Sequence, residues 1–473
     1  MKSILIKIAL LFITATSTLS AAEIPNVLFV IADDASRHYG KAYDCDWADT
    51  PHIDSLAATG LVFDNAYVPT SKCGPCRSAL MTGRNPWQLG AGANHQSLFP
   101  PEHKAFGEVL TANGIACGAS GKTWGPGTAI DTEGKTRDFG LSAYPKGGGF
   151  ESFLKEKKEG APFFFWYGSG NPHRGYPKGT GLKQGKELTD IDHVPAYWPD
   201  NATIRGDMLD YATEIEKFDQ EVGSLLAVLK KTGHFQNTIV IVTSDHGMPF
   251  PRVKGHTYDD AHRVPFVVHW PGQRKSTQRV SDLLTLTDLA PTLFELFGVE
   301  AGMEFSGGSF VDLLKGEPQK DRPFVIIGRE RNDVQTRPGY PDGAGYPARG
   351  IRMGDHLYVH NFKSDRWPCG NPEMGMKDTD NSPTKSFINA LGKGDIYWEH
   401  NFGKRPAAQL YDVVKDPDCV SNLAGSLPEL EEQLHDTLMS ELKRQKDPRV
   451  LGNGEEFDNY MSRKRTKKNK KQK

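Results

Sequence analysis

Three runs of apolar residues, each about as long as a β-strand, stand out along the chain. They cover residues 26–32, 162–167 and 238–243. Continuous apolar runs of this length are typical of central strands in a parallel sheet that is covered on both faces. Each run leads into polar side chains that can bind ligands. Because ligands bind beyond the carboxyl ends of strands in open α/β sheets, the pattern predicts one shared site.

Helical patterns separate these strands, and the composition changes near residues 315–325. Apolar residues spaced three and four apart predict helices over 52–60, from about 208 to 229, and from 288 onwards. Beyond the change, the chain shows three short strand-like runs and a last helix, at 324–327, 356–360, 409–413 and 427–443. Strands followed by one helix are typical of a small antiparallel α+β unit.

These elements predict an α/β fold with two folded parts. A central, mostly parallel sheet flanked by helices is expected over residues 23–319, followed by a smaller C-terminal antiparallel α+β subdomain over residues 320–450. Residues 451–473 form a basic end that we expect to be disordered and solvated, although weak attraction to an anionic polysaccharide is the alternative. Its last eleven residues carry eight positive charges, so the net charge of −2 hides an acidic body.

The N-terminus has the pattern of a signal peptide over residues 1–22. Lys2 and Lys7 provide the positive start, residues 8–13 an apolar core, and residues 20–22 the small side chains of a cleavage site. The apolar core is too short to span a bilayer comfortably, which argues against an uncleaved anchor. We therefore expect an exported protein, periplasmic or secreted, with no stable membrane insertion and no nucleic-acid partner.

Six cysteines are too few and too scattered for a disulfide framework.

Two polar pairs follow the first and third apolar runs directly. Asp33 and Asp34 follow one strand, and Asp245 and His246 follow the other. One such pair would be weak evidence, because polar pairs often cap helices or lie in solvent. Two pairs at two strand ends are stronger, and their carboxylates suit Ca²⁺, with Mg²⁺ as the alternative, because both ions prefer oxygen ligands.

The stretch Cys73-Gly74-Pro75-Cys76-Arg77 supports two different enzymes. Cys-x-x-Cys is the motif of thiol-disulfide oxidoreductases. The same residues satisfy Cys-x-Pro-x-Arg, the signature from which sulfatases make formylglycine, and the continuation at 78–84 closely resembles the type I sulfatases. Thioredoxin domains are small and a redox role leaves the acidic pairs unexplained, so the sulfatase interpretation is favoured.

The resemblance to type I sulfatases, in the alkaline-phosphatase-like superfamily, covers residues 24 to about 450. The motifs at 121–126, 171–174 and 245–251 are most similar to the heparan N-sulfatase (sulfamidase) branch. The resemblance implies a sulfated glycan substrate, a maturation enzyme that oxidises Cys73 to formylglycine, and a divalent cation. The implied cation ligands are Asp33, Asp34, Asp245, His246 and the modified Cys73. The implied catalytic residues are Cys73, Arg77, Lys122, His173 and Lys254, and the implied substrate-binding residues are Arg174 and His95.

The implied mechanism begins with hydration of the aldehyde at position 73. One hydroxyl attacks sulfur, His173 protonates the leaving atom, and loss of a proton from the second hydroxyl expels sulfate and restores the aldehyde. In the family, a histidine two residues after the lysine that corresponds to Lys122 helps to remove that last proton. This chain has Trp124 at that position. Another group, such as His95, takes this role or the catalytic details differ.

Several alternatives stay open from the sequence. A phosphodiesterase or phosphonate hydrolase of the same superfamily would share the cation site and even the aldehyde. A glycan-binding protein without activity would account for Trp124. The scissile bond is N–S or O–S, and specificity is expected in the loops at 140–149 and 333–349.

Overall fold

The computed structural model describes residues 24–271, 276–318, 322–340 and 343–462. The predicted signal peptide at 1–22 and the basic residues 463–473 lie outside the described residues. Within the described residues, no helix combines the length and the apolar character that crossing a membrane requires.

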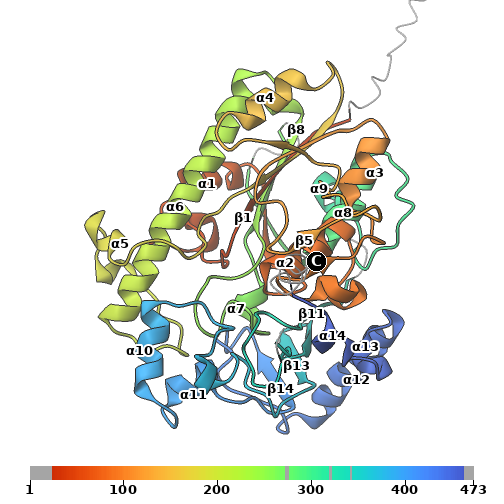
Figure 1. Cartoon of the computed structure of the whole chain (residues 1–473). Coiled ribbons are helices and arrows are strands. Elements are labelled where there is room, and N and C mark those ends of the chain that lie inside the picture. The colour runs from red at the N-terminus through yellow and green to blue at the C-terminus, as the bar shows by residue number, and fades with distance from the viewer. Residues whose placement is uncertain (1–23, 272–275, 319–321, 341–342, 463–473) are drawn as a thin grey trace, which may run out of the picture.

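An eight-stranded sheet forms the centre of the larger part of the molecule (Figure 1). Its order is β10-β2-β9-β8-β1-β7-β4-β6, and β9 runs antiparallel to both of its neighbours while the other pairs are parallel. The three strands predicted from continuous apolar runs are confirmed as β1, β7 and β8, which lie side by side. The strand bounds are β1 Asn26–Ala32, β2 Leu61–Tyr67, β4 Ala116–Gly121, β6 Ser142–Tyr144, β7 Phe163–Gly168, β8 Thr238–Ser244, β9 Phe266–His269 and β10 Gln278–Thr285.

Helices cover both faces of this sheet. Alternate residues of β1 belong to two separate hydrophobic clusters, because side chains of a strand point to opposite faces in turn. One cluster packs against α1 (Pro51–Ala57), α4 (Gly149–Glu156) and α6 (Ala202–Lys231). The other packs against α2 (Cys73–Thr82), α3 (Phe106–Ala112), α8 (Leu289–Phe297) and α9 (Val311–Lys315). Both faces of the strands are therefore apolar, as predicted.

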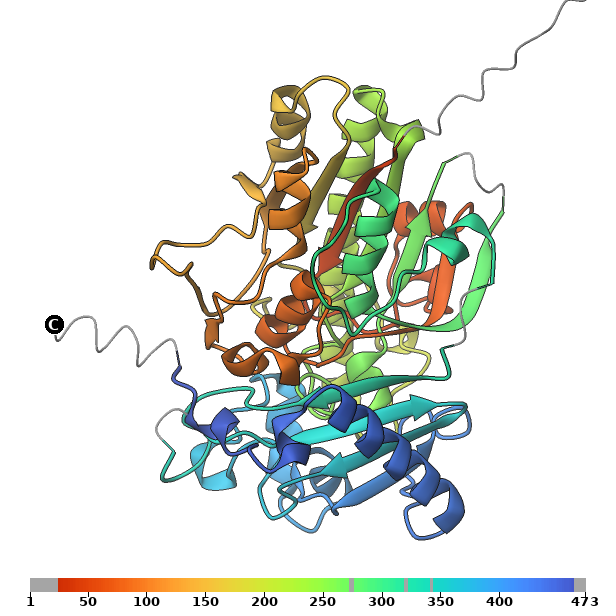
Figure 2. The same ribbon diagram turned by 90° about the vertical axis from the view of Figure 1, so that its right-hand side faces the viewer.

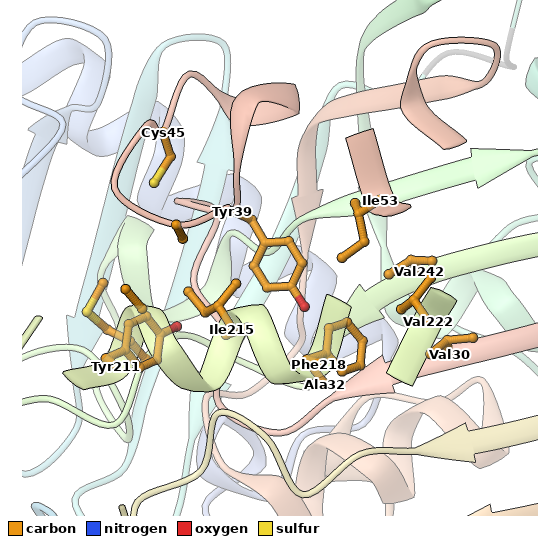
Figure 3. Packing of buried hydrophobic residues seen from close by; sticks show 14 of the residues in the cluster. Val30, Ala32, Tyr39, Cys45, Ile53, Tyr211, Ile215, Phe218, Val222 and Val242 are labelled. Atoms are coloured by element: carbon orange, nitrogen blue, oxygen red, sulfur yellow. The ribbon is translucent and has the colours of Figure 1, made fainter. Parts of the chain in front are cut away.

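The long helix α6 illustrates how the first face is built (Figure 3). Its buried residues Ile215, Phe218 and Val222 follow the three- and four-residue spacing seen in the sequence, and they lie over Val30 and Val242 of the sheet. The helix begins at Ala202, earlier than predicted, because the Asn201 side chain accepts hydrogen bonds from the first-turn amides.

A second, four-stranded antiparallel sheet forms the C-terminal part and lies below the large sheet in Figure 2. Its order is β11-β12-β13-β14. Leu434, Leu438 and Leu442 of the last long helix pack on one face, and the other face contacts Tyr67 and Tyr258 of the larger part. The antiparallel arrangement is as expected. The bounds are β11 Phe324–Arg329, β12 Ala348–Met353, β13 His356–Asn361, β14 Ala408–Asp412, α10 Pro383–Leu391, α11 Ile396–Phe402 and α12 Pro428–Arg444.

Part of the segment that we assigned to a disordered end is folded. Residues 451–462 contain helix α14 (Glu456–Asn459), and Phe457 is fully buried against the second sheet and α12. The short helix α13 (Pro448–Leu451) precedes it. The remaining short elements are α5 Thr180–Lys183, α7 Asp259–His262, and a small parallel pair formed by β3 Leu98–Phe99 and β5 Thr128–Ala129.

Candidate active site

The two polar pairs predicted at the strand ends lie next to each other. Strands β1 and β8 are paired in parallel with Ala32 opposite Ser244, so the residues that follow them are brought to the same edge. The Asp34 amide donates a hydrogen bond to Asp245 Oδ1 over 3.0 Å. The side chains of Asp34, Asp245 and His246 are fully buried and that of Asp33 is nearly so. Three carboxylates and one imidazole therefore share one desolvated site.

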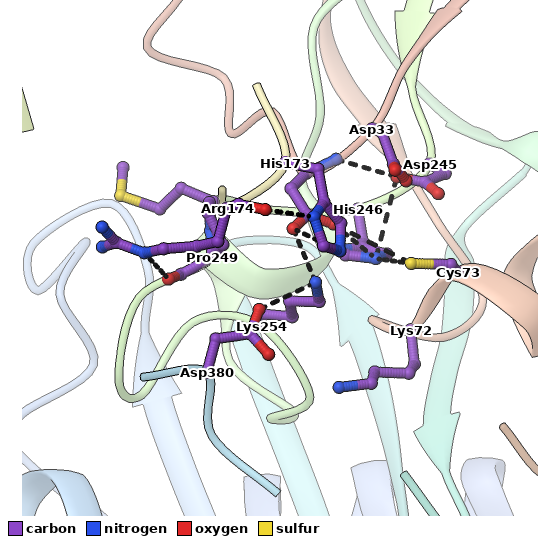
Figure 4. Close-up of polar contacts among 12 residues, drawn as sticks. Asp33, Lys72, Cys73, His173, Arg174, Asp245, His246, Pro249, Lys254 and Asp380 are labelled. Carbon is purple, nitrogen blue, oxygen red and sulfur yellow. Dashed lines mark hydrogen bonds and ion pairs between the residues drawn. The ribbon is translucent and has the colours of Figure 1, made fainter. Parts of the chain in front are cut away.

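Cys73 is the first residue of α2 and points into this site (Figure 4). Its Sγ lies 3.3 Å from His246 Nε2 and 3.9 Å from Asp34 Oδ1. Burial opposes ionisation of the Cys73 thiol, but the neighbouring cations Lys122, Lys254 and His246 outweigh it and hold its pKa well below the usual value. The site therefore stabilises negative charge at position 73.

Cys76 occupies a different environment from Cys73. It is completely buried in the apolar cluster between α2 and the sheet, and burial raises the pKa of its thiol well above the usual value. The Cys73 residue is itself only 2% exposed. Thiol-disulfide exchange of the Cys-x-x-Cys type needs both thiols, and Cys76 is fully buried among apolar side chains with a raised pKa, so the geometry argues against it.

The donor set fits a divalent cation. Ligand atoms of Asp34, Cys73 and His246 lie within 4.8 Å of one another, and so do those of Asp33, Cys73 and Asp245. His246 Nδ1 is 3.0 Å from the Gly247 carbonyl, so Nδ1 donates to it and Nε2 is the nitrogen that faces the carboxylates. Burial opposes protonation of His246, yet Asp245 and Asp34 raise its pKa to about 9. The site thus favours added positive charge, which an oxygen-coordinated cation would supply.

Three cationic side chains surround the carboxylates. Arg77 is fully buried. Its Nε donates to Asp245 Oδ2 over 2.9 Å, and its Nη2 lies 3.5 Å from Asp33 Oδ1. Lys122, directly after β4, donates to both oxygens of Asp33 over 2.6 and 2.7 Å. Lys254 donates to Asp34 Oδ2 over 2.6 Å. The structure therefore brings together all three predicted cations, which balance the charge of the buried acids.

His173 reaches the site from the segment that follows β7. Its Nδ1 is 2.8 Å from the Arg174 carbonyl, and its Nε2 lies 3.9 Å from Asp34 Oδ2. Asp34 raises the pKa of His173 above its ordinary value of 6.5, against the effect of burial. Its side chain is 41% exposed, more than those of the other site residues, so His173 lies where the site opens to solvent.

Arg174 is placed differently from the other predicted residues. Its guanidinium makes two hydrogen bonds to Asp207 of α6, at 2.5 and 2.9 Å, and donates through Nε to the Pro249 carbonyl. It also lies 4.3 Å from the centre of the Phe250 ring. These contacts use three of the five N–H groups of Arg174 and tie its loop, which carries His173, to α6.

Trp124 and His95 occupy neighbouring but distinct places. Trp124 donates from Nε1 to Ser78 Oγ over 2.8 Å and packs against the rings of Phe99 and Phe139. Its indole offers no acceptor, so it cannot take a proton. His95 Nδ1 is 2.8 Å from the Asn332 carbonyl and donates to it, and no hydrogen-bond partner for Nε2 exists among the described residues. A methyl group built at Gly74 would lie 3.6 Å from His95 Cδ2, so this ring edge faces the turn beside Cys73.

The structure adds three residues that the sequence did not indicate. Lys72 donates to Asp333 Oδ2 over 3.0 Å, and Lys254 lies 2.9 Å from Asp380 Oδ2. Lys72 stands next to Cys73 in the sequence, so its position was available as a signal. Asp333 and Asp380 come from the C-terminal part, and no local pattern connects them with the strand ends.

Comparison with known proteins gives a consistent result. The family model described as Sulfatase matches residues 25–146 and 148–299. The chain is 24% identical to an ulvan-active sulfatase of Formosa agariphila, over 90% of this chain and 75% of the relative, and 27% identical to human N-sulphoglucosamine sulphohydrolase, over 87% and 89%. A solved structure from work on glycosaminoglycan metabolism by Bacteroides thetaiotaomicron superposes with a TM-score of 0.69 at 18% identity, over 91% of this chain and 98% of that one.

Proposed function

The chain belongs to the sulfatase family, and from this we propose that it hydrolyses sulfate ester or sulfamate groups on a sulfated glycan, using formylglycine made from Cys73 and a divalent cation. The observation that supports this best is the buried Cys73 thiol beside three carboxylates, His246 and three cations. Similarity to N-sulphoglucosamine sulphohydrolase supports a sulfated carbohydrate as the substrate class. Sulfate release from a panel of N- and O-sulfated sugars tests the activity and assigns the bond.

The side chains divide the work in this proposal. Asp33, Asp34, Asp245, His246 and residue 73 would hold the cation. When bound, Ca²⁺ or Mg²⁺ supplies Lewis acidity, and the hydrated aldehyde, whose oxygens would stand where Sγ now lies, supplies the nucleophile. The cation would also compensate the acids that Lys122 and Lys254 now neutralise, which leaves both ammonium groups for the sulfate oxygens. Arg77 stays bound to Asp245 and fixes the start of α2.

His173 is proposed as the acid that protonates the leaving oxygen or nitrogen. Its Nδ1 is engaged with the Arg174 carbonyl, so Nε2 is the nitrogen that faces the site. We propose Arg174 as a positioning residue, because its pairing with Asp207 holds this loop. The pairing leaves two N–H groups of Arg174 for the predicted substrate contact.

Replacing His173 by glutamine is expected to lower kcat/KM for sugar sulfates by about 10² to 10⁴-fold, the usual contribution of a general acid. The loss should be smaller for 4-nitrophenyl sulfate, whose leaving group needs little protonation. Because the protonated imidazole is the proposed acid, wild-type activity should fall as pH rises through the pKa of His173, which Asp34 raises in the cation-free protein. A pH profile with both substrates checks this; equal losses on both substrates would contradict the acid role.

His95 is proposed to accept the proton that the family histidine, absent here, would take. The supporting observations are its unpartnered Nε2, the position of the adjoining Cδ2 beside Gly74, and a tryptophan at position 124 that has no acceptor. A substrate contact, the other role predicted for His95, uses the same lone pair.

Changing His95 to alanine should slow expulsion of sulfate and leave sulfate attached to residue 73, at a turnover about 10²-fold lower. Mass spectrometry of the quenched enzyme measures the attached sulfate, and the Trp124→Phe variant serves as the matched control. A variant that turns over slowly with no attached sulfate would assign His95 to substrate binding instead.

Phosphoryl transfer is the alternative that shares this site. A phosphodiesterase or phosphonate hydrolase would use the same acids and cations, so matched sulfate and phosphate esters must be compared directly. We propose that sulfate esters or sulfamates are the better substrates. We further propose that the protein is exported and that a formylglycine-generating enzyme acts on Cys73 beforehand.

A further inference from the structure

Asp380 provides a carboxylate at the open side of the site. One of its oxygens lies 2.9 Å from Lys254 Nζ, and its ligand atom lies within 4.8 Å of those of Asp34 and His173. Its side chain is 26% exposed, whereas those of Lys254 and Asp34 are 4% and 0% exposed. Figure 4 shows Asp380 on a separate segment of chain that approaches the site beside Lys254.

The surrounding cations satisfy this carboxylate only in part. Lys254 already has a closer partner in Asp34, at 2.6 Å. Asp380 Oδ2 is buried and lies against Lys254 Nζ as an ion pair without a hydrogen bond, and no hydrogen bond from the described residues reaches Oδ1. An ionised carboxylate offers acceptors alone, so it can be satisfied only by a donor. That donor position is next to His173, the residue proposed to protonate the leaving group.

We propose that Asp380 determines specificity by accepting a hydrogen bond from a hydroxyl or N–H group of the leaving sugar, close to the scissile bond. This inference rests on the proposed sulfatase function. A leaving group without such a donor would leave the Asp380 carboxylate unpaired. A leaving group with a second sulfate or a carboxylate at that position would be repelled by the negative charge of Asp380. The substrate class is therefore a sugar whose neighbouring substituent is a hydroxyl or an amine-type group.

The test compares two substrates in Asp380→Ala. For the monosulfated glucosamine that the wild type hydrolyses best, kcat/KM should fall about 10 to 100-fold further than for 4-nitrophenyl sulfate, which has no donor, as expected for a lost hydrogen bond to a charged group. In Asp380→Asn, a disulfated sugar with sulfate on the neighbouring position should gain relative to the monosulfated one. Asp436→Asn, whose side chain is 72% exposed, is the matched control and should match the wild type.

Two results would overturn the inference. Equal losses on the sugar and on 4-nitrophenyl sulfate would mean that Asp380 acts only by holding Lys254. No loss on either substrate would mean that Asp380 makes no contact with the substrate.

Failure of the proposed function gives a different outcome, in which the wild type releases sulfate from neither substrate. In that case, calorimetric binding of each monosulfated glucosamine in the panel to Cys73→Ser protein still decides the inference. Asp380→Ala in that background should weaken binding about 10 to 100-fold. Unchanged binding would overturn it.

Discussion

Cys73→Ala protein is expected to release sulfate no faster than a protein-free control, a loss on the order of 10⁴-fold or more, because the proposed nucleophile is made from this side chain. The fold should survive. Cys73 is at the first position of α2, and alanine keeps its backbone and Cβ while removing a sulfur that lies among polar groups. Sulfate release and the thermal unfolding midpoint, measured on the same preparation, separate chemistry from stability.

Cys76→Ser is the matched control for this experiment. It preserves Cys-x-Pro-x-Arg and removes the second thiol of Cys-x-x-Cys. A sulfatase should therefore retain activity to within several-fold, although the serine hydroxyl, buried among apolar side chains, should lower stability. A thiol oxidoreductase would lose its activity with either substitution. Sulfate release that survives Cys73→Ala, or disappears in well-folded Cys76→Ser, would contradict the proposal.

Removing the divalent cation should abolish activity and lower stability together. Asp33, Asp34 and Asp245 are buried in one site, and burial and the neighbouring Asp245 raise the pKa of Asp33 despite the opposing effect of Lys122. A cation that binds only the native state stabilises it by about 2.7 kcal/mol at a hundredfold excess over its Kd. Calcium should therefore raise the unfolding midpoint of chelator-treated wild type.

The Asp245→Asn variant should lose this calcium response and about 10² to 10³-fold of its activity, because one charged ligand is gone. Asp436→Asn, far more exposed, should keep both. Calorimetric unfolding with and without calcium makes the comparison. Full activity after chelation, or a calcium response retained by Asp245→Asn, would exclude the proposed cation site.

The sequence predicted the elements whose patterns are local. β1, β7 and β8 are apolar on both faces, so their continuous runs of apolar residues were enough to identify them. β12 was missed because it contains Arg349 and Arg352, which look exposed in a sequence. Arg349 is in fact fully buried, where it pairs with Asp447 and Glu330. These partners lie far apart in the chain, so no local pattern reveals the pairing.

The same reasoning explains which parts of the site could be predicted. Asp33 and Asp245 follow strands that turned out to be adjacent, and the parallel register joins them. Asp333 lies 261 residues from Lys72, and only the docking of the C-terminal part brings the two together. Asp333 starts the loop at 333–349, whose influence on specificity stays a prediction. Asp380 lies outside both predicted loops.

The most direct test of the central claim is the mass of the peptide that contains Cys73, taken from protein produced with a formylglycine-generating enzyme and shown to be active. The account predicts a peptide with the mass of an aldehyde at position 73, which reacts with a hydrazide probe and is absent from the Cys73→Ala variant. An active enzyme whose Cys73 is entirely an unmodified thiol would contradict it.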